Sequence, residues 1–213
     1  QMCIRDRDSG VHGILLQSPI PTGLDFEAAV ALVPVEKDVD GLTVESLGRL
    51  VRGLPGHVSC TPLGVLRILQ HYAIPTSGKK AVVIGRSTLV GLPMAILLQR
   101  KGIDATVTIA HSRTDNLAGV CAEADILVAA TGMPRMVDST FVKPGATVID
   151  VGISRVDEKI MGDVSFESVN EVAGALTPMP GGTGPMTVGC LIENTWAGYL
   201  WQREGIEPSL VRS

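Results

Sequence analysis

The chain has few aromatic residues, no long apolar run and no excess of positive charge, and each shortage excludes a class of protein. Only 3% of its 213 residues are Phe, Trp or Tyr, so its core must be aliphatic, and a hydrophobic content of 45% excludes wholesale disorder. No apolar run approaches the ~18 residues of a membrane-spanning helix. A net charge of −4 argues against a general nucleic-acid binder.

The cysteines also lack a pattern. Cys3, Cys60, Cys121 and Cys190 form no CxxC pair and no His–Cys cluster. This scatter favours reduced thiols over disulfides or zinc, so we predict no metal site. Residues 1–7 are charged and have no apolar stretch of the kind found in a signal peptide.

Apolar, β-branched segments alternate with helical ones in the later part of the chain. The expected strands are 80–84, 105–110, 126–130, 146–151 and 175–177. The expected helices are 90–100, 116–124, 163–172 and 188–202. Such alternation implies right-handed βαβ units, so the fold class predicted is α/β with a Rossmann-type parallel sheet.

The first part of the chain is less regular. Val11–Gln17 is predicted to be a short buried strand, and Asp25 is a suitable N-cap for a short helix. Thr61-Pro62 begins a helix that runs to about Tyr72, because a hydroxyl at the N-cap and a proline at the first helical position favour a helix start. Residues 36–41 are predicted to be a charged loop.

A glycine-containing turn follows the expected strand 80–84. Its spacing, Gly85-x-Ser87-x-x-x-Gly91-x-Pro93, departs from G-x-G-x-x-G, and the serine offers a hydroxyl where the middle glycine would stand. A doubly wound fold binds a dinucleotide pyrophosphate at this place. We therefore predict that Gly85, Arg86 and Ser87 contact a cofactor. An ordinary tight turn is the alternative.

The end of the next strand indicates which dinucleotide binds. A NAD site usually has an acidic residue there, whereas this chain has Ser112 and Arg113. A hydroxyl and a guanidinium suit a 2′-phosphate, and Arg86 adds positive charge nearby, so NADP is the predicted cofactor. The alternative for Arg113 is a solvated surface charge.

Three further residues are predicted to bind the cofactor because they follow expected strands. Thr131 and Gly132 come after 126–130, and Ile153 comes after 146–151. Ligands of open parallel sheets lie at the carboxyl ends of the strands. Plain turn chemistry would explain each residue equally well.

Motifs along most of the chain closely resemble the bifunctional methylenetetrahydrofolate dehydrogenase/methenyltetrahydrofolate cyclohydrolase family. They occur in the family's order, from about Asp8 to about Trp201. The motifs are His12–Pro21, Lys37–Gly41, Cys60–Gly64, Val83–Ser87, His111–Thr114, Val148–Ile153, Gly162–Val164 and Pro180–Thr187.

The resemblance implies an enzyme of one-carbon metabolism, which supports purine biosynthesis. Such an enzyme oxidises methylenetetrahydrofolate, passes the hydride to NADP, and hydrolyses the methenyl product to formyltetrahydrofolate. It also implies a cytoplasmic homodimer that acts on a tetrahydrofolate derivative and binds neither nucleic acid nor membrane.

The resemblance assigns roles to residues of the first part. Gln17 matches an active-site glutamine that hydrogen-bonds the catalytic lysine, although a polar residue at a strand end is its alternative. Asp40 matches the aspartate that anchors the pterin, where a carboxylate can accept two N–H groups. Both are predicted catalytic residues. Asp38 is expected to structure its loop, and Lys37 to be a surface charge.

The segment Pro180–Thr187 resembles the one that closes over the folate. Glycines allow close backbone approach and prolines stiffen the loop, although the segment could equally be a turn into the last helix. The predicted substrate contacts are Asp40, Pro180, Gly181, Gly182 and Pro185. Other polar residues are given structural or lining roles: His12, His111, Asp150 and Asp163.

The sequence departs from the family in one respect. The family's Tyr-x-x-x-Lys segment has no counterpart, because neither Tyr72 nor Tyr199 is followed by lysine four residues on. We therefore expect a fragment that begins with a non-native junction at 1–7, lacks the proton-transfer lysine and turns over little or no folate.

The expected domains follow from the motifs. Residues 1–74 form a partial α/β catalytic domain that binds folate, 75–187 form the NADP-binding Rossmann domain, and 188–213 form a helix that returns to the catalytic domain. With part of that domain missing, we expect exposed apolar surface on Val11–Leu16 and on the last helix.

Two other functions remain open at this stage. One is an NADP-binding module without catalysis, and the other is a different Rossmann dehydrogenase that acts on shikimate or an amino acid. Folate-dependent formation of NADPH separates the first from the enzyme. The motifs at 37–41 and 180–187 argue against the second.

Overall fold

The chain divides into two compact units. The structure, a computed structural model, describes the backbone of residues 2–209 and side chains from residue 4 onward, so the predicted thiol of Cys3 lies outside the described side chains. Unit 1 consists of residues 1–60 and 188–213, and unit 2 of residues 61–187.

The first division point differs from the predicted one at residue 74. Residues 61–74 group with unit 2, because the helix over residues 60–71 packs against the end of that unit. A Cβ on Gly64 would lie 3.2 Å from the carbonyl carbon of Met186, and the Thr187 hydroxyl lies 3.2 Å from that of Thr61.

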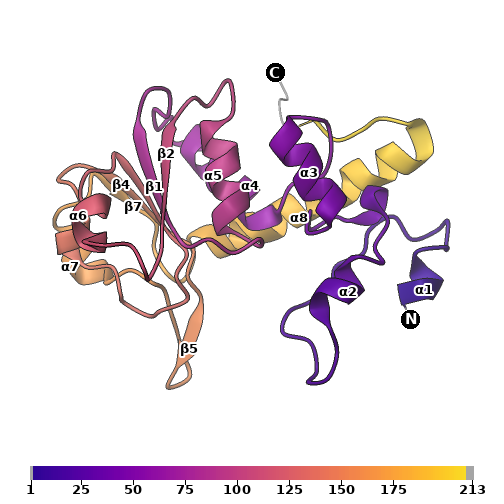
Figure 1. The fold of residues 1–213 in the computed structure, drawn as a ribbon, viewed down its shortest axis with the longest axis horizontal. Coiled ribbons are helices and arrows are strands. Elements are labelled where there is room, and N and C mark those ends of the chain that lie inside the picture. The colour runs from indigo at the N-terminus through magenta and orange to yellow at the C-terminus, as the bar shows by residue number, and fades with distance from the viewer. Residues whose placement is uncertain (1, 210–213) are drawn as a thin grey trace. The chain divides into compact units, whose positions relative to one another are not determined.

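Unit 2 contains a five-stranded parallel sheet, which confirms the predicted fold class (Figure 1). The strand order is β2-β1-β3-β4-β7. The strands are β1 Lys80–Ile84, β2 Thr106–Ala110, β3 Ile126–Ala129, β4 Thr147–Asp150 and β7 Ala175–Leu176. Ile84 pairs with both Ala110 and Ala129, and Ala129 pairs with Asp150, so the carboxyl ends of β1 to β4 form one edge.

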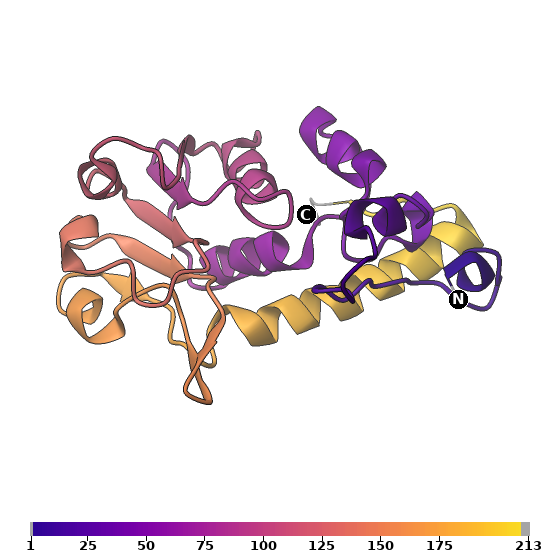
Figure 2. The ribbon, with the colours of Figure 1, turned by 60° about the horizontal axis from the view of Figure 1, so that its bottom comes forward.

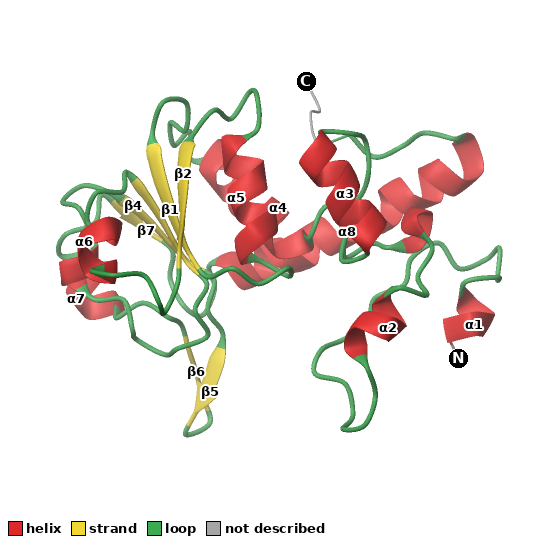
Figure 3. Ribbon diagram, in the orientation of Figure 1, coloured by secondary structure: helices red, strands yellow, loops and turns green. Residues whose placement is uncertain are grey.

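Helices cover both faces of this sheet. Those of unit 2 are α5 Gly91–Gln99, α6 Leu117–Cys121 and α7 Phe166–Asn170, with α4 Cys60–His71 beginning one residue before the unit. Figure 3 shows α6 and α7 on one side of the sheet and α4 and α5 on the other. Every predicted element in this region is present, although most are one to three residues shorter at one or both ends, because terminal residues of a helix or strand often miss the defining hydrogen bonds.

The core of unit 2 is aliphatic, as the shortage of aromatic residues requires. β3 and β4 are buried along their whole length. One face of the sheet contributes Val82, Leu127 and Val148 to a cluster with the α6–α7 side. Met94 and Leu97 of α5, both 0% exposed, belong to the other side. Aliphatic side chains therefore fill the layers between the helices and both faces of the sheet.

Unit 2 also contains an antiparallel hairpin that the sequence pattern did not predict. β5 Ser154–Val156 pairs with β6 Lys159–Met161, and the hairpin projects beyond the main sheet (Figure 2). Its two-residue turn places Asp157 at φ 45° and Glu158 at φ 63°. Such turns normally contain Asn or Gly, so the usual sequence signal for a hairpin is absent.

Unit 1 is mainly helical in the described residues. Its shorter helices are α1 Met2–Arg5, α2 Phe26–Val30, the 3-10 helix η1 Val35–Lys37, and α3 Val44–Arg52. The last helix, α8 Thr183–Glu204, begins in unit 2 and continues into unit 1. Asp25 caps α2 by accepting the N–H of Ala28 at 3.1 Å, which confirms the predicted cap, whereas α3 was not predicted.

The predicted strand at Val11–Gln17 is wrong. The segment is extended but pairs at one point only, a parallel bridge between Ile14 and Asp38. The N–H of Ile14 donates to the carbonyl of Lys37 at 2.8 Å. An apolar extended segment becomes a strand only where a neighbouring segment pairs along it, and sequence pattern does not report that.

Apolar side chains are exposed on the parts of unit 1 where we expected them. Leu15 is 42% exposed, and Val188, Ile192 and Trp196 are 58%, 67% and 56% exposed. The last three recur every four residues and so share one face of α8. In the described part of the chain, no helix is both long and apolar enough to cross a membrane.

Replacing Gly41 by alanine is expected to destabilise unit 1 strongly. Gly41 has φ +65°, and a Cβ there would lie 2.6 Å from the Ser59 nitrogen and the Val58 carbonyl carbon. Gly53→Ala is the matched control, because Gly53 has φ +68° but nothing within 4 Å of its Cβ position. Gly53→Ala should lower the free energy of unfolding by about 1 kcal/mol, and Gly41→Ala by more than about 2 kcal/mol. Urea unfolding of both variants checks this; equal losses would contradict it.

Candidate functional site

The turn after β1 is a close-packed cradle at the edge of the sheet. Gly85 has φ +128°, and a Cβ on it would collide with the carbonyl oxygen of Ala130 after β3. A Cβ on Gly91 would likewise collide with the carbonyl oxygen of Gly85. Only glycine allows these backbones to approach so closely. The turn therefore packs main chain directly against main chain at the end of the sheet.

Ser87 and Arg86 differ in what they do in this turn. The Ser87 hydroxyl accepts the N–H groups of Val90 and Gly91 at 3.2 and 3.4 Å, so it caps the start of α5. The side chain of Arg86 is exposed. The turn thus combines the N-terminus of a helix with the exposed positive charge of Arg86.

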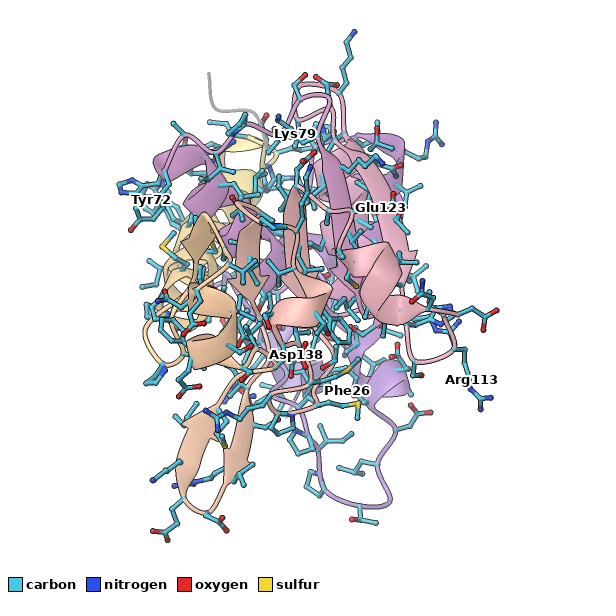
Figure 4. All side chains as sticks on the ribbon, turned by 90° about the vertical axis from the view of Figure 1, so that its left-hand side faces the viewer. Phe26, Tyr72, Lys79, Arg113, Glu123 and Asp138 are labelled. Carbon is cyan, nitrogen blue, oxygen red and sulfur yellow. The ribbon has the colours of Figure 1, made fainter. Side chains whose placement is uncertain are left out.

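The turn after β2 lies beside the turn after β1. The N–H of Gly85 donates to the Ala110 carbonyl at 2.8 Å, so the two strand ends are adjacent. His111 Nδ1 accepts the N–H of Arg113 at 3.2 Å, which gives His111 a turn-forming role. Ser112 and Arg113 are exposed, and Figure 4 shows Arg113 extending away from the ribbon.

Two buried aspartates organise the turns after β3 and β4. Asp150, the last residue of β4, accepts the N–H groups of Gly152, Asp163 and Val164, each at 3.0 Å. Burial raises the pKa of its carboxyl group, and these three donors oppose the shift. The structural role predicted for Asp150 is confirmed. Ile153, three residues beyond the end of β4, is 64% exposed.

Asp163 holds the turn that follows β3. Its Oδ2 accepts the N–H of Thr131 at 2.5 Å and that of Gly132 at 3.0 Å. The predicted structural role of Asp163 is confirmed as well. The sequence did not show that its partners are two residues predicted to contact a cofactor.

The segment Pro180–Thr187 is partly helical. Its last five residues form the first turn of α8, so the predicted helix start at 188 is wrong. Pro185 is compatible with that turn because first-turn N–H groups have no helical acceptor. The Thr183 hydroxyl donates to the Asp150 carbonyl at 3.0 Å, which fixes the segment at the end of β4. Pro180, Gly181 and Pro185 are exposed, and Gly182 is half-buried.

In unit 1, Asp40 is half-buried in a loop that its neighbours hold rigidly. Burial raises the pKa of the Asp40 carboxyl, while a hydrogen bond with the Cys60 side chain opposes the shift. Asp38 accepts from Leu42 N, Thr43 N and Ser46 Oγ, which confirms it as a loop-structuring residue.

The prediction that Lys37 is a surface charge is wrong. Lys37 is 5% exposed, and its Nζ donates to the carbonyl oxygens of Arg5, Asp6 and Asp8 at 3.2, 2.8 and 2.9 Å. Three acceptors satisfy all three ammonium N–H groups, so the charge can be buried. Sequence composition around Lys37 gave no sign of these distant carbonyls.

Gln17 is exposed, and its Nε2 donates to the carbonyl of Ser18 at 3.0 Å. His12 lies at the start of the same segment, where its Nδ1 is 3.2 Å from the Gln202 Oε1 and its ring meets Tyr199 edge-on. These contacts agree with a structural His12. The structure thus gathers the predicted cofactor residues on one sheet edge, while Gln17 and Asp40 belong to unit 1.

Asn194 was missed by the sequence analysis. It is 5% exposed, and its Nδ2 donates to the carbonyls of Val39 and Val58 at 2.8 and 2.9 Å, beside Asp40. Asn194 lies between Glu193 and Thr195 in α8, so the sequence pattern does not single it out. Among the described residues, no group of three or more His, Cys, Asp or Glu side chains is placed to hold a metal ion.

Comparison with known proteins identifies relatives along most of the chain. Residues 59–203 match the family model for the tetrahydrofolate dehydrogenase/cyclohydrolase NAD(P)-binding domain. A bifunctional protein FolD from Desulfovibrio desulfuricans is 55% identical over 187 residues, which cover 87% of this chain and 66% of the relative. A FolD 2 protein from Frankia alni is 56% identical over 188 residues, covering 88% of this chain and 65% of the relative.

Solved structures of FolD enzymes resemble this chain as well. The FolD enzyme of Campylobacter jejuni superposes with a TM-score of 0.89 at 41% identity, covering 93% of this chain and 70% of that one. The FolD of Trypanosoma brucei, complexed with NADP and an inhibitor, gives 0.88 at 36% identity with the same coverage. The chain spans 65–66% of the two curated relatives. It belongs to the tetrahydrofolate dehydrogenase/cyclohydrolase family, and residues 59–203 form that family's NAD(P)-binding domain.

Proposed function

We propose that the chain binds NADP at the carboxyl edge of its parallel sheet and belongs to an enzyme that oxidises methylenetetrahydrofolate and hydrolyses the methenyl product to formyltetrahydrofolate. The observation that carries the cofactor choice is the pair of exposed arginines, Arg86 and Arg113, on adjacent turns. Relatives named bifunctional FolD, and a solved relative in complex with NADP, support the reaction.

The residues of the edge have the chemistry that the dinucleotide needs. The glycine cradle at Gly85 and the N-terminus of α5 suit a pyrophosphate, because the positive end of the helix dipole favours negative charge. Arg113, with Ser112 beside it, suits a 2′-phosphate. The bound nicotinamide would supply the hydride chemistry, and the protein supplies orientation.

On the folate side, we propose that Asp40 anchors the pterin. As a carboxylate it can accept the amino and ring N–H groups together. Its loop is held by the Asp38 cap and by the Asn194 amide, so the carboxylate is preorganised. Gln17, Pro180, Gly181, Gly182 and Pro185 are proposed as further substrate contacts.

The second candidate is an NADP-binding module without turnover. Folate-dependent formation of NADPH by the chain separates the two: its presence supports the enzyme, and NADP binding without it supports the module. Membership of the tetrahydrofolate dehydrogenase/cyclohydrolase family argues against the other candidate, a dehydrogenase that acts on shikimate or an amino acid.

We also propose a cytoplasmic homodimer, which the resemblance implies. The exposed apolar face of α8 supports an association surface.

Replacing Arg113 by alanine is expected to weaken NADP binding about tenfold or more and to leave NAD binding unchanged, because only NADP carries the 2′-phosphate. Calorimetric titration of each cofactor measures both affinities. Lys101→Ala, which removes an exposed positive charge following α5, is the control and should change neither. A wild-type chain that prefers NAD would contradict the proposal.

Affinity for tetrahydrofolate is expected to fall as the solution is acidified through the raised pKa of Asp40. The reason is that a protonated carboxyl can no longer accept both pterin N–H groups, so binding is strong above that pKa and weak below it. Fluorescence titration across pH measures this. Asp40→Asn should bind weakly with a flat profile, and Asp25→Asn should keep the wild-type profile. An unchanged profile in Asp40→Asn would remove Asp40 from the site.

A further inference from the structure

Asp150 and Asp163 form a pair of buried carboxylates, 2% and 0% exposed, that the proposed function has not used. A carboxylate remains buried only where several donors point at it. Five main-chain N–H groups do so here, three at Asp150 and two at Asp163. One of the three is the N–H of Asp163 itself, so the first carboxylate positions the second.

Two glycines show how tightly the pair is enclosed. A Cβ on Gly152 would overlap the Asp163 carboxylate, and a Cβ on Gly162 would overlap that of Asp150. The backbone after β4 and the backbone after β6 therefore press directly on the two side chains. The Asp163 carboxylate has little freedom to turn away from the N–H groups that it accepts.

The consequence concerns the turn after β3. The main-chain N–H groups of Thr131 and Gly132 donate to the Asp163 carboxylate. The next N–H group, that of Met133, donates to the Thr131 hydroxyl oxygen at 3.0 Å. The turn therefore has no main-chain donor left at these three positions for a ligand. It can offer carbonyl oxygens, which suit hydroxyl and amide donors and do not suit a phosphate.

The sheet topology indicates which part of a dinucleotide meets this turn. In the order β2-β1-β3-β4-β7 the chain leaves β1 for β2 and then returns to the other side of β1, so the crevice lies between β1 and β3. The 2′-phosphate site proposed at Arg113 follows β2. The opposite half of the dinucleotide, with the nicotinamide and its ribose, would then lie over β3 and β4.

We propose that Asp163 is a positioning residue for the nicotinamide half of NADP: by accepting the N–H groups of Thr131 and Gly132 it turns this loop into an acceptor surface for the ribose hydroxyls and the carboxamide. The inference rests on the proposed NADP binding and adds to it a residue with no expected ligand contact of its own.

The test compares two ligands, NADP and adenosine 2′,5′-bisphosphate, which has the 2′-phosphate but no nicotinamide half. Asp163→Ala is expected to lose NADP affinity about tenfold and to bind the bisphosphate as the wild type does. Asp163→Asn keeps an acceptor oxygen and should stay within about threefold for both ligands. A general loss of structure would weaken both ligands together.

Asp138→Ala is the matched control. It removes a negative charge and two local hydrogen bonds, from the N–H and the hydroxyl of Thr140, in the same unit, and should alter neither affinity. Unchanged NADP binding by a folded Asp163→Ala, or an equal loss for the two ligands, would overturn the inference. A wild-type chain that binds no NADP would overturn the proposed function as well.

A measurement on the wild-type chain covers the case in which Asp163→Ala does not fold. The amide protons of Thr131 and Gly132 should exchange slowly with solvent in the absence of NADP, because Asp163 already holds them. Exchange at the rate of an unstructured peptide would show that the turn is not held and would overturn the inference.

Discussion

The geometry of the carboxyl edge depends on buried carboxylates that accept main-chain N–H groups. Asp150 ends a buried strand, and its side chain reaches the turns beyond β4 and β6, while Asp163 reaches the turn beyond β3. Turns at a strand end have N–H groups without ladder partners, and a carboxylate satisfies several of them at once. The same contacts explain why small residues, Gly152 and Gly162, stand beside them.

In unit 1, buried polar side chains also hydrogen-bond main-chain groups and so hold the loops in place. Asp38 accepts N–H groups of the residues that lead into α3. The Lys37 ammonium donates to three carbonyl oxygens near the start of the chain, and the Asn194 amide donates to two carbonyl oxygens beside Asp40. Each of these side chains is buried and well satisfied, so each also fixes the direction of the backbone around it. The Asp40 carboxylate is consequently held in place by its neighbours.

The sequence predicted the elements of unit 2 well and those of unit 1 less well. The strands of unit 2 are short apolar runs between turn residues, and such runs pair because successive helices carry the chain back over the sheet. Val11–Gln17 has an equally apolar pattern, yet only Ile14 pairs. The hairpin at 154–161 lacks the usual glycine or asparagine, whereas α3 has ordinary helix signals, with Thr43 at its N-cap and Gly53 at its end. For Val11–Gln17 and for the hairpin, the missing information was a pairing neighbour or a turn conformation.

By itself, the sequence determined the fold class, the cradle at Gly85, the positive charges that favour NADP and the family, because these depend on local spacing and residue type. The tertiary structure decided what the buried polar groups do. It placed Lys37 inside the protein, brought Asn194 to the loop of Asp40, and set Asp163 against Thr131 and Gly132. Those partners are separated by tens of residues or more, and a sequence read along one direction does not show which distant carbonyl or N–H a buried side chain will meet.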